Sequence, residues 1–247
     1  MAIILGIDVG GTGIKAALVD TDEGTMVSDR RRIKTPQPST PENVAAAVKQ
    51  LVVEFDYSGT IGCCFPTVVI DGKAKTAGNI DKTWRNTQID AAFSDATGLP
   101  FVVVNDADAA GMAEMGLGAG VGLQGMVIMI TIGTGLGSGV FYNGQLIPNI
   151  ELGRMPGKDG ELIEFYAGNR ARKVNGLSWQ EWGPRFNYFL EQVATVFSPD
   201  HFILGGGASK NFHQYENAIK VPTAIHVARF RDEAGIIGAA LAAIHRD

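Results

Sequence analysis

Short apolar runs alternate along the chain with longer segments in which apolar residues recur at helical spacing. The short runs predict strands at 3–9, 14–20, 25–33, 61–65, 101–105, 126–132, 138–142 and 202–205. The longer segments predict helices at 41–54, 88–97, 107–117, 160–173, 178–198 and 233–245. This alternation of strands and helices is typical of an α/β fold.

Two of the predicted helices carry further signals. Thr40 precedes Pro41, which is the pattern of a capping side chain followed by a proline in the first helical turn. The segment 178–198 places tryptophan and phenylalanine residues at helical spacing. Such an aromatic stripe is typical of a core or a dimer face rather than of a ligand site.

The first two predicted strands are joined by a glycine-rich turn. Asp8 lies at the end of the first strand, and the turn runs over 10–13. Glycines at this place permit positive φ, and clustered backbone N–H groups suit the oxygens of a phosphate, with Asp8 placed to hold a magnesium ion. A P-loop is excluded because its Gly-Lys-Ser/Thr ending is absent and a strand follows the turn. An ordinary tight hairpin is the alternative.

A second segment, 126–141, repeats this arrangement of apolar strand, Gly/Thr turn and strand. Thr12 and Thr134 lie within the two turns. The glycines at 133–139 do not form a dinucleotide-binding fingerprint, because no helical segment follows them. The repeat predicts two related lobes, each presenting a phosphate-binding hairpin to a shared cleft.

Composition narrows the class of protein. The 247 residues include 19% charged and 45% hydrophobic residues and carry a formal net charge of −5, which gives no electrostatic footprint for nucleic acid or an anionic membrane. The run Arg30–Arg32 is a local concentration of positive charge in this acidic chain. We interpret it as the solvent-exposed face of a strand, and contact with a polyanion is the alternative. No signal peptide or membrane-spanning run is visible, and Cys63 and Cys64 are adjacent, so we expect a cytoplasmic protein with reduced thiols.

Several motifs along nearly the whole chain occur together in one family. They are Gly6-Ile-Asp-Val-Gly-Gly-Thr-Gly-Ile-Lys15, Thr35-Pro-Gln-Pro38, Asn79-Ile-Asp-Lys-Thr-Trp84, Asn105-Asp-Ala-Asp-Ala-Ala-Gly111, Thr131–Ser138, Glu151-Leu-Gly153, Gly205-Gly-Gly207 and Ala234–Ala240. The chain resembles the ROK branch of the actin/Hsp70/sugar-kinase superfamily. Within that branch it is similar to the polyphosphate glucokinases, mainly through its Thr-Pro-Gln-Pro and Asn-Ile-Asp-Lys-Thr-Trp segments.

The resemblance implies a two-lobed, ribonuclease H-like α/β fold with a central cleft. It places residues 1–106 and about 234–247 in a small lobe and 107–233 in a larger one. It also implies a homodimer that transfers a phosphoryl group from polyphosphate, ATP or both to the 6-hydroxyl of glucose or a similar hexose. Mannose, fructose and amino sugars remain alternative acceptors. Mg²⁺ is the expected cofactor, and zinc is not expected because the family's zinc cysteines are missing.

The resemblance also assigns roles to individual residues. Asp106 becomes the catalytic base, although it follows an apolar strand and could instead cap the next helix in competition with Asp108. The residues implied in sugar binding are Asn79, Asn105, Glu151, Arg154 and Glu164. The residues implied in phosphate or nucleotide binding are Asp8, Gly10, Gly11, Thr12, Lys15, Thr131, Gly133, Thr134, Gly135, Gly206 and Gly207, with Asp8 also facing Mg²⁺.

One position departs from the family pattern. Arg154 stands where the family usually has a histidine that contacts the sugar. A permanently charged guanidinium cannot reproduce the hydrogen bonding of a neutral imidazole. Arg154 could bind an acidic sugar, pair with Glu161 or Glu164, or weaken glucose binding and leave a sugar-binding protein. A transcription regulator is disfavoured, because the first hairpin starts at residue 3 with no helix-turn-helix segment before it.

Overall fold

The computed structural model describes residues 2–158 and 160–244, and the chain forms two compact units. Unit 1 contains the described residues of Met1–Ala113 and Glu233–Asp247, and unit 2 contains those of Glu114–Asp232. The sequence predicts a division at the start of the helix that follows Asn105. The contacts place it inside that helix, α3 (Asp106–Leu117), because Ala109 packs against Cys64 and Ala239 of unit 1.

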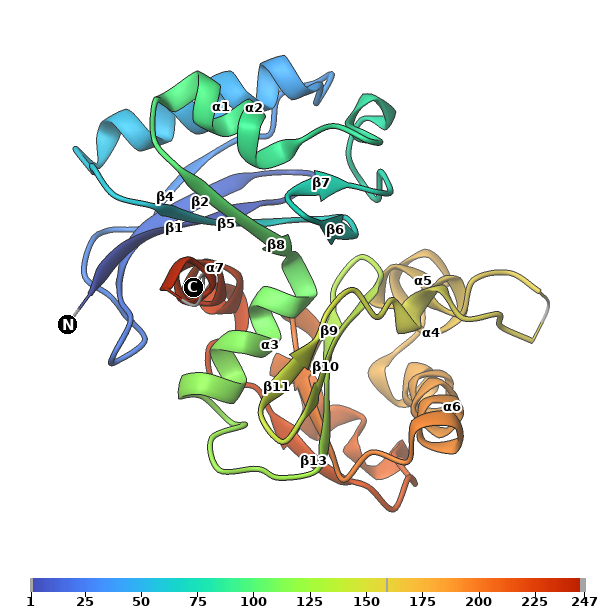
Figure 1. Ribbon diagram of the computed structural model, residues 1–247. Coiled ribbons are helices and arrows are strands. Elements are labelled where there is room, and N and C mark those ends of the chain that lie inside the picture. Colours follow the sequence, from blue (N-terminus) through green and yellow to red (C-terminus); the bar gives the residue numbers. More distant parts are fainter. Residues whose placement is uncertain (1, 159, 245–247) are drawn as a thin grey trace. The chain divides into compact units, whose positions relative to one another are not determined.

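Unit 1 is built on a mixed sheet with the strand order β3-β2-β1-β5-β8, and β4 also pairs with β2 (Figure 1). The strands are β1 (Ile3–Val9), β2 (Ile14–Asp20), β3 (Thr25–Met26), β4 (Arg31–Ile33), β5 (Ile61–Phe65) and β8 (Phe101–Asn105). β1 and β2 form an antiparallel hairpin, whereas β5 and β8 continue the sheet in parallel with β1. The polar residues that follow β1 and β8 therefore lie at the same end of the sheet, where these parallel strands finish.

Helices cover both faces of the unit 1 sheet (Figure 1). α1 (Pro41–Glu54) and α2 (Ile89–Thr97) pack together over the apolar core, and Thr40 Oγ1 caps α1 by accepting the Asn43 N–H at 3.4 Å, as predicted. α7 (Ala234–Ile244) packs on the opposite face against β1 and β5. Its approach requires glycines in the sheet, because a Cβ on Gly62 would lie 1.8 Å from the carbonyl oxygen of Ala239.

Unit 2 repeats the sheet plan of unit 1, with the order β11-β10-β9-β12-β13. Its strands are β9 (Met126–Ile132), β10 (Leu136–Tyr142), β11 (Gln145–Ile147), β12 (His201–Gly205) and β13 (Ala224–Val227). β9 and β10 form the hairpin, and β12 and β13 run parallel to β9. The prediction of a repeated hairpin is confirmed.

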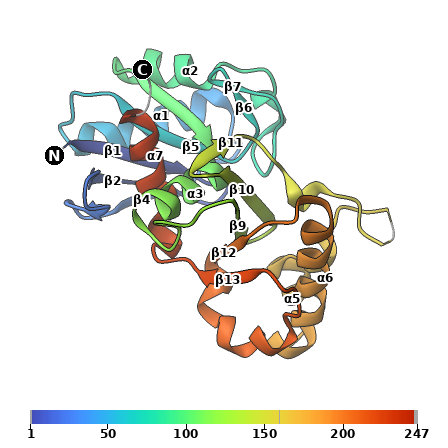
Figure 2. The ribbon, with the colours of Figure 1, turned by 60° about the horizontal axis from the view of Figure 1, so that its bottom comes forward.

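The aromatic stripe of the predicted 178–198 helix forms part of the core of unit 2. α6 (Trp179–Phe197) lies beside the sheet of unit 2 (Figure 2). Its side chains Trp182, Phe186 and Phe189 are fully buried and pack in one core with residues of β9 and β12. Its start is a capping box, in which Ser178 and Glu181 satisfy each other's backbone N–H groups. The core interpretation of this stripe is therefore confirmed.

Two predicted elements are wrong in detail. The strand predicted at 25–33 is two short strands, β3 and β4, that pair separately with β2. The helix predicted at 160–173 is divided into α4 (Glu164–Ala167) and α5 (Asn169–Val174), because Gly168 is extended with φ −72° and ψ 160°. Residue 245, the predicted end of the last helix, lies outside the described residues.

Several short elements have no periodic signal and were not predicted. They are the strands β6 (Val69–Ile70), β7 (Lys73–Ala74), β11 and β13, and the 3₁₀ turns Lys82–Trp84, Leu152–Arg154, Gly207–Gln214, Glu216–Ala218 and Arg231–Glu233. Among residues 2–158 and 160–244, no helix combines the length and apolarity needed to cross a bilayer.

Candidate functional site

The parallel strands of unit 1 bring two predicted carboxylates to the same sheet edge. Asp8 on β1 lies beside Cys64 on β5, and Phe65 in turn lies beside Asn105, which precedes Asp106. Burial raises the pKa of the Cys64 thiol well above its ordinary value, and the negative charges of Asp8 and Asp106 raise it further. The parallel register places both carboxylates at the same end of the sheet, on or directly after the strands that flank β5. Polar groups at the carboxyl ends of parallel strands are the usual location of ligand sites in α/β sheets.

Asp8 is held through both of its oxygens. Lys15 Nζ, from the opposite position on β2, lies 2.8 Å from Asp8 Oδ2, and the Cys64 thiol donates to Oδ1 over 3.5 Å. This fixes a carboxylate and an ammonium group at the base of the glycine turn. A single carboxylate fits Mg²⁺, which keeps several waters and usually takes one or two protein carboxylates together with substrate phosphates.

The glycine turn of the first hairpin is packed against neighbouring segments. The Gly10 N–H donates to the Gly13 carbonyl at 3.0 Å, and Thr35 Oγ1 donates to the Gly10 carbonyl at 2.5 Å. A Cβ on Gly11 would lie 2.8 Å from the carbonyl oxygen of Asn79. None of these turn glycines has a positive φ, so the left-handed conformation that glycine permits is not adopted here. Gly11 is required instead because its neighbour leaves no room for a side chain.

Asn105 and Asp106 have different environments at the start of α3. Asn105 is 4% exposed, donates to the Thr67 carbonyl at 3.0 Å, and accepts the N–H groups of Ala107 and Asp108 at 2.8 and 3.1 Å. The side chain of Asn105 thus performs the capping that the sequence suggested for Asp106 or Asp108. Asp106 also accepts the Ala107 N–H, at 2.8 Å, but its side chain is exposed. This exposure leaves the Asp106 carboxylate within reach of a substrate.

In unit 2, the turn of the second hairpin is held by Glu164. The Gly133 N–H donates to the Gly135 carbonyl at 3.1 Å, and Glu164 Oε2 accepts the Leu136 N–H at 3.3 Å. A Cβ on Gly135 would lie 1.9 Å from Glu164 Oε2. Glu164 is therefore not an isolated surface acid, because it packs directly against the hairpin that the sequence assigned to phosphate binding.

The segment around Glu151 is attached to β10. Ser138 Oγ donates to the Ile150 carbonyl and accepts the Leu152 N–H at 2.9 Å, which fixes the backbone on both sides of Glu151. Arg154 is exposed at the end of the following 3₁₀ turn. Within the described part of the chain, Arg154 forms no ion pair with Glu161 or Glu164. The suggested pairing of Arg154 with these acids is thus not found.

The three glycines at the end of β12, Gly205 and the two that follow it, lie beside the second hairpin. Gly205 is paired with Thr131 on β9, and Gly206 has φ 73° with its missing Cβ 2.7 Å from the backbone nitrogen of Ile132. A Cβ on Gly207 would meet no atom within 4 Å. The close approach of Gly206 requires glycine, whereas the open space at Gly207 suits a ligand.

The candidate residues are divided between the two units. Unit 1 contains Asp8, Gly10, Gly11, Thr12, Lys15, Asn79, Asn105 and Asp106, and unit 2 contains Thr131, Gly133, Thr134, Gly135, Glu151, Arg154, Glu164, Gly206 and Gly207. The contact of Thr35 with the first glycine turn is not predicted from the sequence, although Thr35 belongs to the Thr-Pro-Gln-Pro motif. Nothing in a local pattern shows that this threonine reaches back to Gly10.

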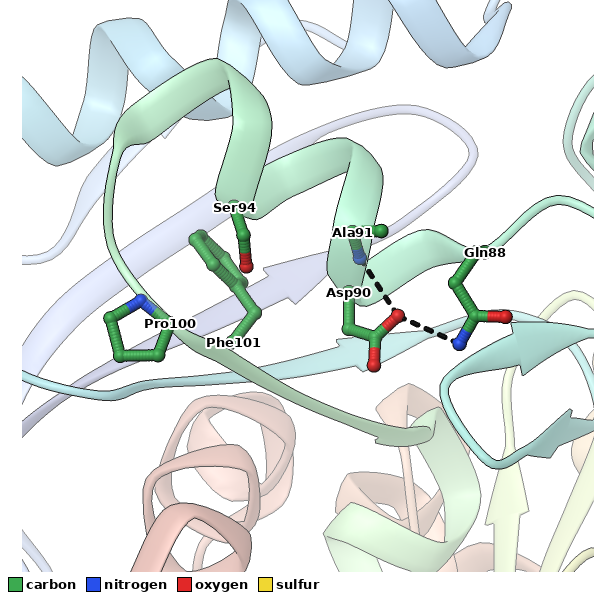
Figure 3. Close-up of a pocket in the computed structure, with 6 residues that line it drawn as sticks. All are labelled: Gln88, Asp90, Ala91, Ser94, Pro100 and Phe101. Carbon is green, nitrogen blue, oxygen red and sulfur yellow. Dashed lines mark hydrogen bonds between the residues drawn. The ribbon is translucent and has the colours of Figure 1, made fainter.

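Two other features lie apart from these residues. Among the described residues, no group of three or more His, Cys, Asp or Glu side chains is arranged to hold a metal ion, and the expectation of no zinc stays a prediction. An open pocket of about 360 Å³ is lined by Gln88, Asp90, Ala91, Ser94, Pro100 and Phe101 (Figure 3). It lies at the start of β8, whereas Asp106 follows the end of that strand, so the pocket is not part of the candidate site.

Comparisons with known proteins identify the family and the fold. The ROK family matches residues 4–151. A polyphosphate glucokinase of Mycobacterium tuberculosis (strain CDC 1551 / Oshkosh) is 38% identical over 240 residues, covering 97% of this chain and 90% of that protein. The crystal structure of an inorganic polyphosphate/ATP-glucomannokinase from Arthrobacter sp. strain KM is similar over 100% of both chains, with a TM-score of 0.95 and 42% identity.

A more distant structure supports the same fold. A ROK family glucokinase from Streptomyces griseus, in complex with glucose and AMPPNP, matches 97% of this chain and 98% of its own, with a TM-score of 0.82 and 26% identity. The expected kinase-type α/β fold is thereby confirmed. The repeated hairpins, the polar strand ends and these similarities lead to one conclusion: the chain belongs to the ROK family.

Proposed function

We propose that this protein is a sugar kinase that transfers a phosphoryl group from polyphosphate, ATP or both to the 6-hydroxyl of glucose or a similar hexose. The observation that carries the proposal is the parallel register of β1, β5 and β8, which brings the Asp8–Lys15 pair beside the glycine turn and Asp106 to the same end of the unit 1 sheet. The similarity to a polyphosphate glucokinase and to a polyphosphate/ATP-glucomannokinase supports the same reaction.

The roles follow from the chemistry of each group. Asp106 accepts the proton of the attacking sugar hydroxyl, for which an exposed carboxylate within hydrogen-bond reach is sufficient. Phosphoryl transfer otherwise depends on positioning and charge stabilisation. Lys15 and the backbone N–H groups of the first turn stabilise the transferred phosphate, and the turn 133–135 with Gly206 and Gly207 contacts the rest of the donor. Asn79, Asn105, Glu151, Arg154 and Glu164 recognise the sugar.

Mg²⁺ belongs to the proposal as the ion that neutralises donor phosphates. Asp8 would hold it together with the phosphate oxygens of the donor, as expected for an ion that takes few protein ligands. A homodimer is proposed from the resemblance to the family. Both points are tested by an equilibrium titration with Mg²⁺ and by sedimentation of the intact protein.

The test of function is a coupled assay with ATP or polyphosphate as donor against glucose, mannose, fructose and an amino sugar. We expect turnover with glucose or mannose and at least one donor. Arg154→His, assayed beside the wild type, reports whether the arginine weakens sugar binding through a change in KM. No turnover with any pair, together with a thermal shift on adding sugar, would show a binding protein instead.

A further inference from the structure

One arginine of the 30–32 run lies directly against the glycine turn of unit 1. Strand β4 pairs with β2 so that Arg32 is opposite Lys15 and Arg31 is opposite Ala16. Side chains of paired residues point to the same face of a sheet, and neighbours along a strand alternate between faces. Arg32 therefore shares a face with Lys15, whereas Arg31 has the same charge but points to the other face.

The guanidinium of Arg32 occupies the space that a side chain at position 13 would need. A Cβ on Gly13 would lie 2.7 Å from Arg32 Nε and 2.9 Å from Nη2. Gly13 does not have a positive φ, so its backbone conformation does not explain the glycine. Arg32 Nη2 also donates to the Thr12 carbonyl at 3.5 Å. The guanidinium of Arg32 therefore lies directly against the turn.

The charge of Arg32 is not neutralised by any carboxylate of the described residues. Lys15 is paired with Asp8, but within residues 2–158 and 160–244 no carboxylate forms an ion pair with Arg32, and its side chain is exposed. A guanidinium carries five N–H donors in a planar fork that matches two phosphate oxygens. The guanidinium of Arg32 lies beside the glycine turn 10–13, whose backbone N–H groups suit an anion.

We propose that Arg32 binds the phosphate chain of the phosphoryl donor and is a donor-specificity residue of this kinase. The inference rests on the proposed function for the identity of the donor. A phosphate chain is common to ATP and to inorganic polyphosphate, and both place oxyanions next to the phosphate that the turn holds. Lys15 acts on that phosphate, and Arg32 contacts a phosphate farther along the chain.

The test is calorimetric binding of inorganic tripolyphosphate and of ATP, each with Mg²⁺ and without sugar, at 0.15 M salt. Arg32→Ala should weaken tripolyphosphate binding about tenfold or more, as expected for charge-assisted hydrogen bonds. Arg31→Ala is the matched control and should change it less than about twofold, because Arg31 points to the other face of the sheet and the charge of an exposed side chain is screened by salt. Arg32→Lys retains the charge without the fork and should remain weakened.

Comparing ATP with tripolyphosphate shows which phosphate of the donor Arg32 contacts. An equal loss for both ligands places Arg32 on phosphate oxygens that they share. A loss for tripolyphosphate alone places Arg32 on the end phosphate, at the oxygen that ATP esterifies to its ribose. Equal effects of the Arg31 and Arg32 variants, or no effect of either, would overturn the proposal. A wild-type protein that binds tripolyphosphate but phosphorylates no sugar would instead contradict the proposed function. Melting temperatures within about 2 °C of wild type exclude misfolding.

Discussion

Glu114 Oε1 accepts a hydrogen bond of 2.7 Å from the backbone N–H of Phe230, although the two residues are 116 positions apart. Glu114 Oε2 accepts two more, from the N–H groups of Ala119 at 2.9 Å and Arg229 at 3.0 Å. The side chain is fully buried. Within unit 2, one carboxylate thus connects the second half of α3 to the segment that precedes the return of the chain to unit 1.

Replacing Glu114 by Gln should lower the free energy of unfolding by about 3 kcal/mol, because the amide NH₂ would face backbone N–H donors that lose their acceptor. Urea unfolding measures this change. Glu54→Gln, on an exposed side chain of α1, is the control and should stay within about 0.5 kcal/mol of wild type. Equal stabilities of the two variants would show that the buried bonds contribute nothing.

Asp106→Asn should reduce kcat by a factor of about 10² to 10⁴, because an amide cannot accept the hydroxyl proton. The dissociation constant of the sugar should change little, and stability should remain close to wild type because the Asp106 side chain is exposed. Single-turnover rates and calorimetric sugar binding separate these quantities. Near-normal turnover in the variant would remove Asp106 from the proposed role of base.

Gly238→Ala should destabilise unit 1 by at least about 2 kcal/mol, because the added methyl group would lie 1.7 Å from the carbonyl oxygen of Ala109 and the backbone of α7 or α3 would have to move. The matched control is Gly207→Ala, whose Cβ meets no atom within 4 Å. Thermal unfolding compares the two variants. A melting temperature of Gly238→Ala equal to that of the control would contradict the close packing of α7.

Both thiols should be unreactive in the folded protein. Burial raises the pKa of Cys63 and of Cys64 well above the ordinary value, and the negative charge of Asp8 raises both further. At pH 8 the reactive thiolate is therefore scarce, and the sulfur atoms are inaccessible. A chromogenic disulfide reagent should detect no thiol in native protein and two after unfolding. Rapid labelling of either cysteine under native conditions would contradict this prediction.

Acid should weaken unit 2 through a histidine pair. His226 Nε2 lies 3.2 Å from His201 Nδ1, and burial followed by the charge of His201 lowers the pKa of His226 below 6.5. The unfolded chain then binds more protons than the folded one just below pH 6.5, so stability falls as the pH decreases through this range. His226→Gln should flatten the profile of unfolding free energy between about pH 7 and 5. An unchanged slope would exclude His226 as its source.

Much of the fold was predictable because its signals are local. The two hairpins, α1 and α6 each carry a continuous apolar pattern with recognisable turn or capping residues, and their positions are confirmed. The break at Gly168 was missed because a glycine can be tolerated within a helix. β13 was missed because its exposed and half-buried residues form no apolar stripe.

The sequence alone determined the repeated glycine-rich hairpins, the acid at the end of each relevant strand and the family to which they belong, since these depend on residue type and short spacing. The tertiary structure decided which groups meet. Strand register placed Arg32 rather than Arg31 beside Lys15, packing against the Asn79 carbonyl rather than positive φ explained Gly11, and Asn105 took over the capping of α3. These relationships join segments that are distant in the chain, so no local pattern records them.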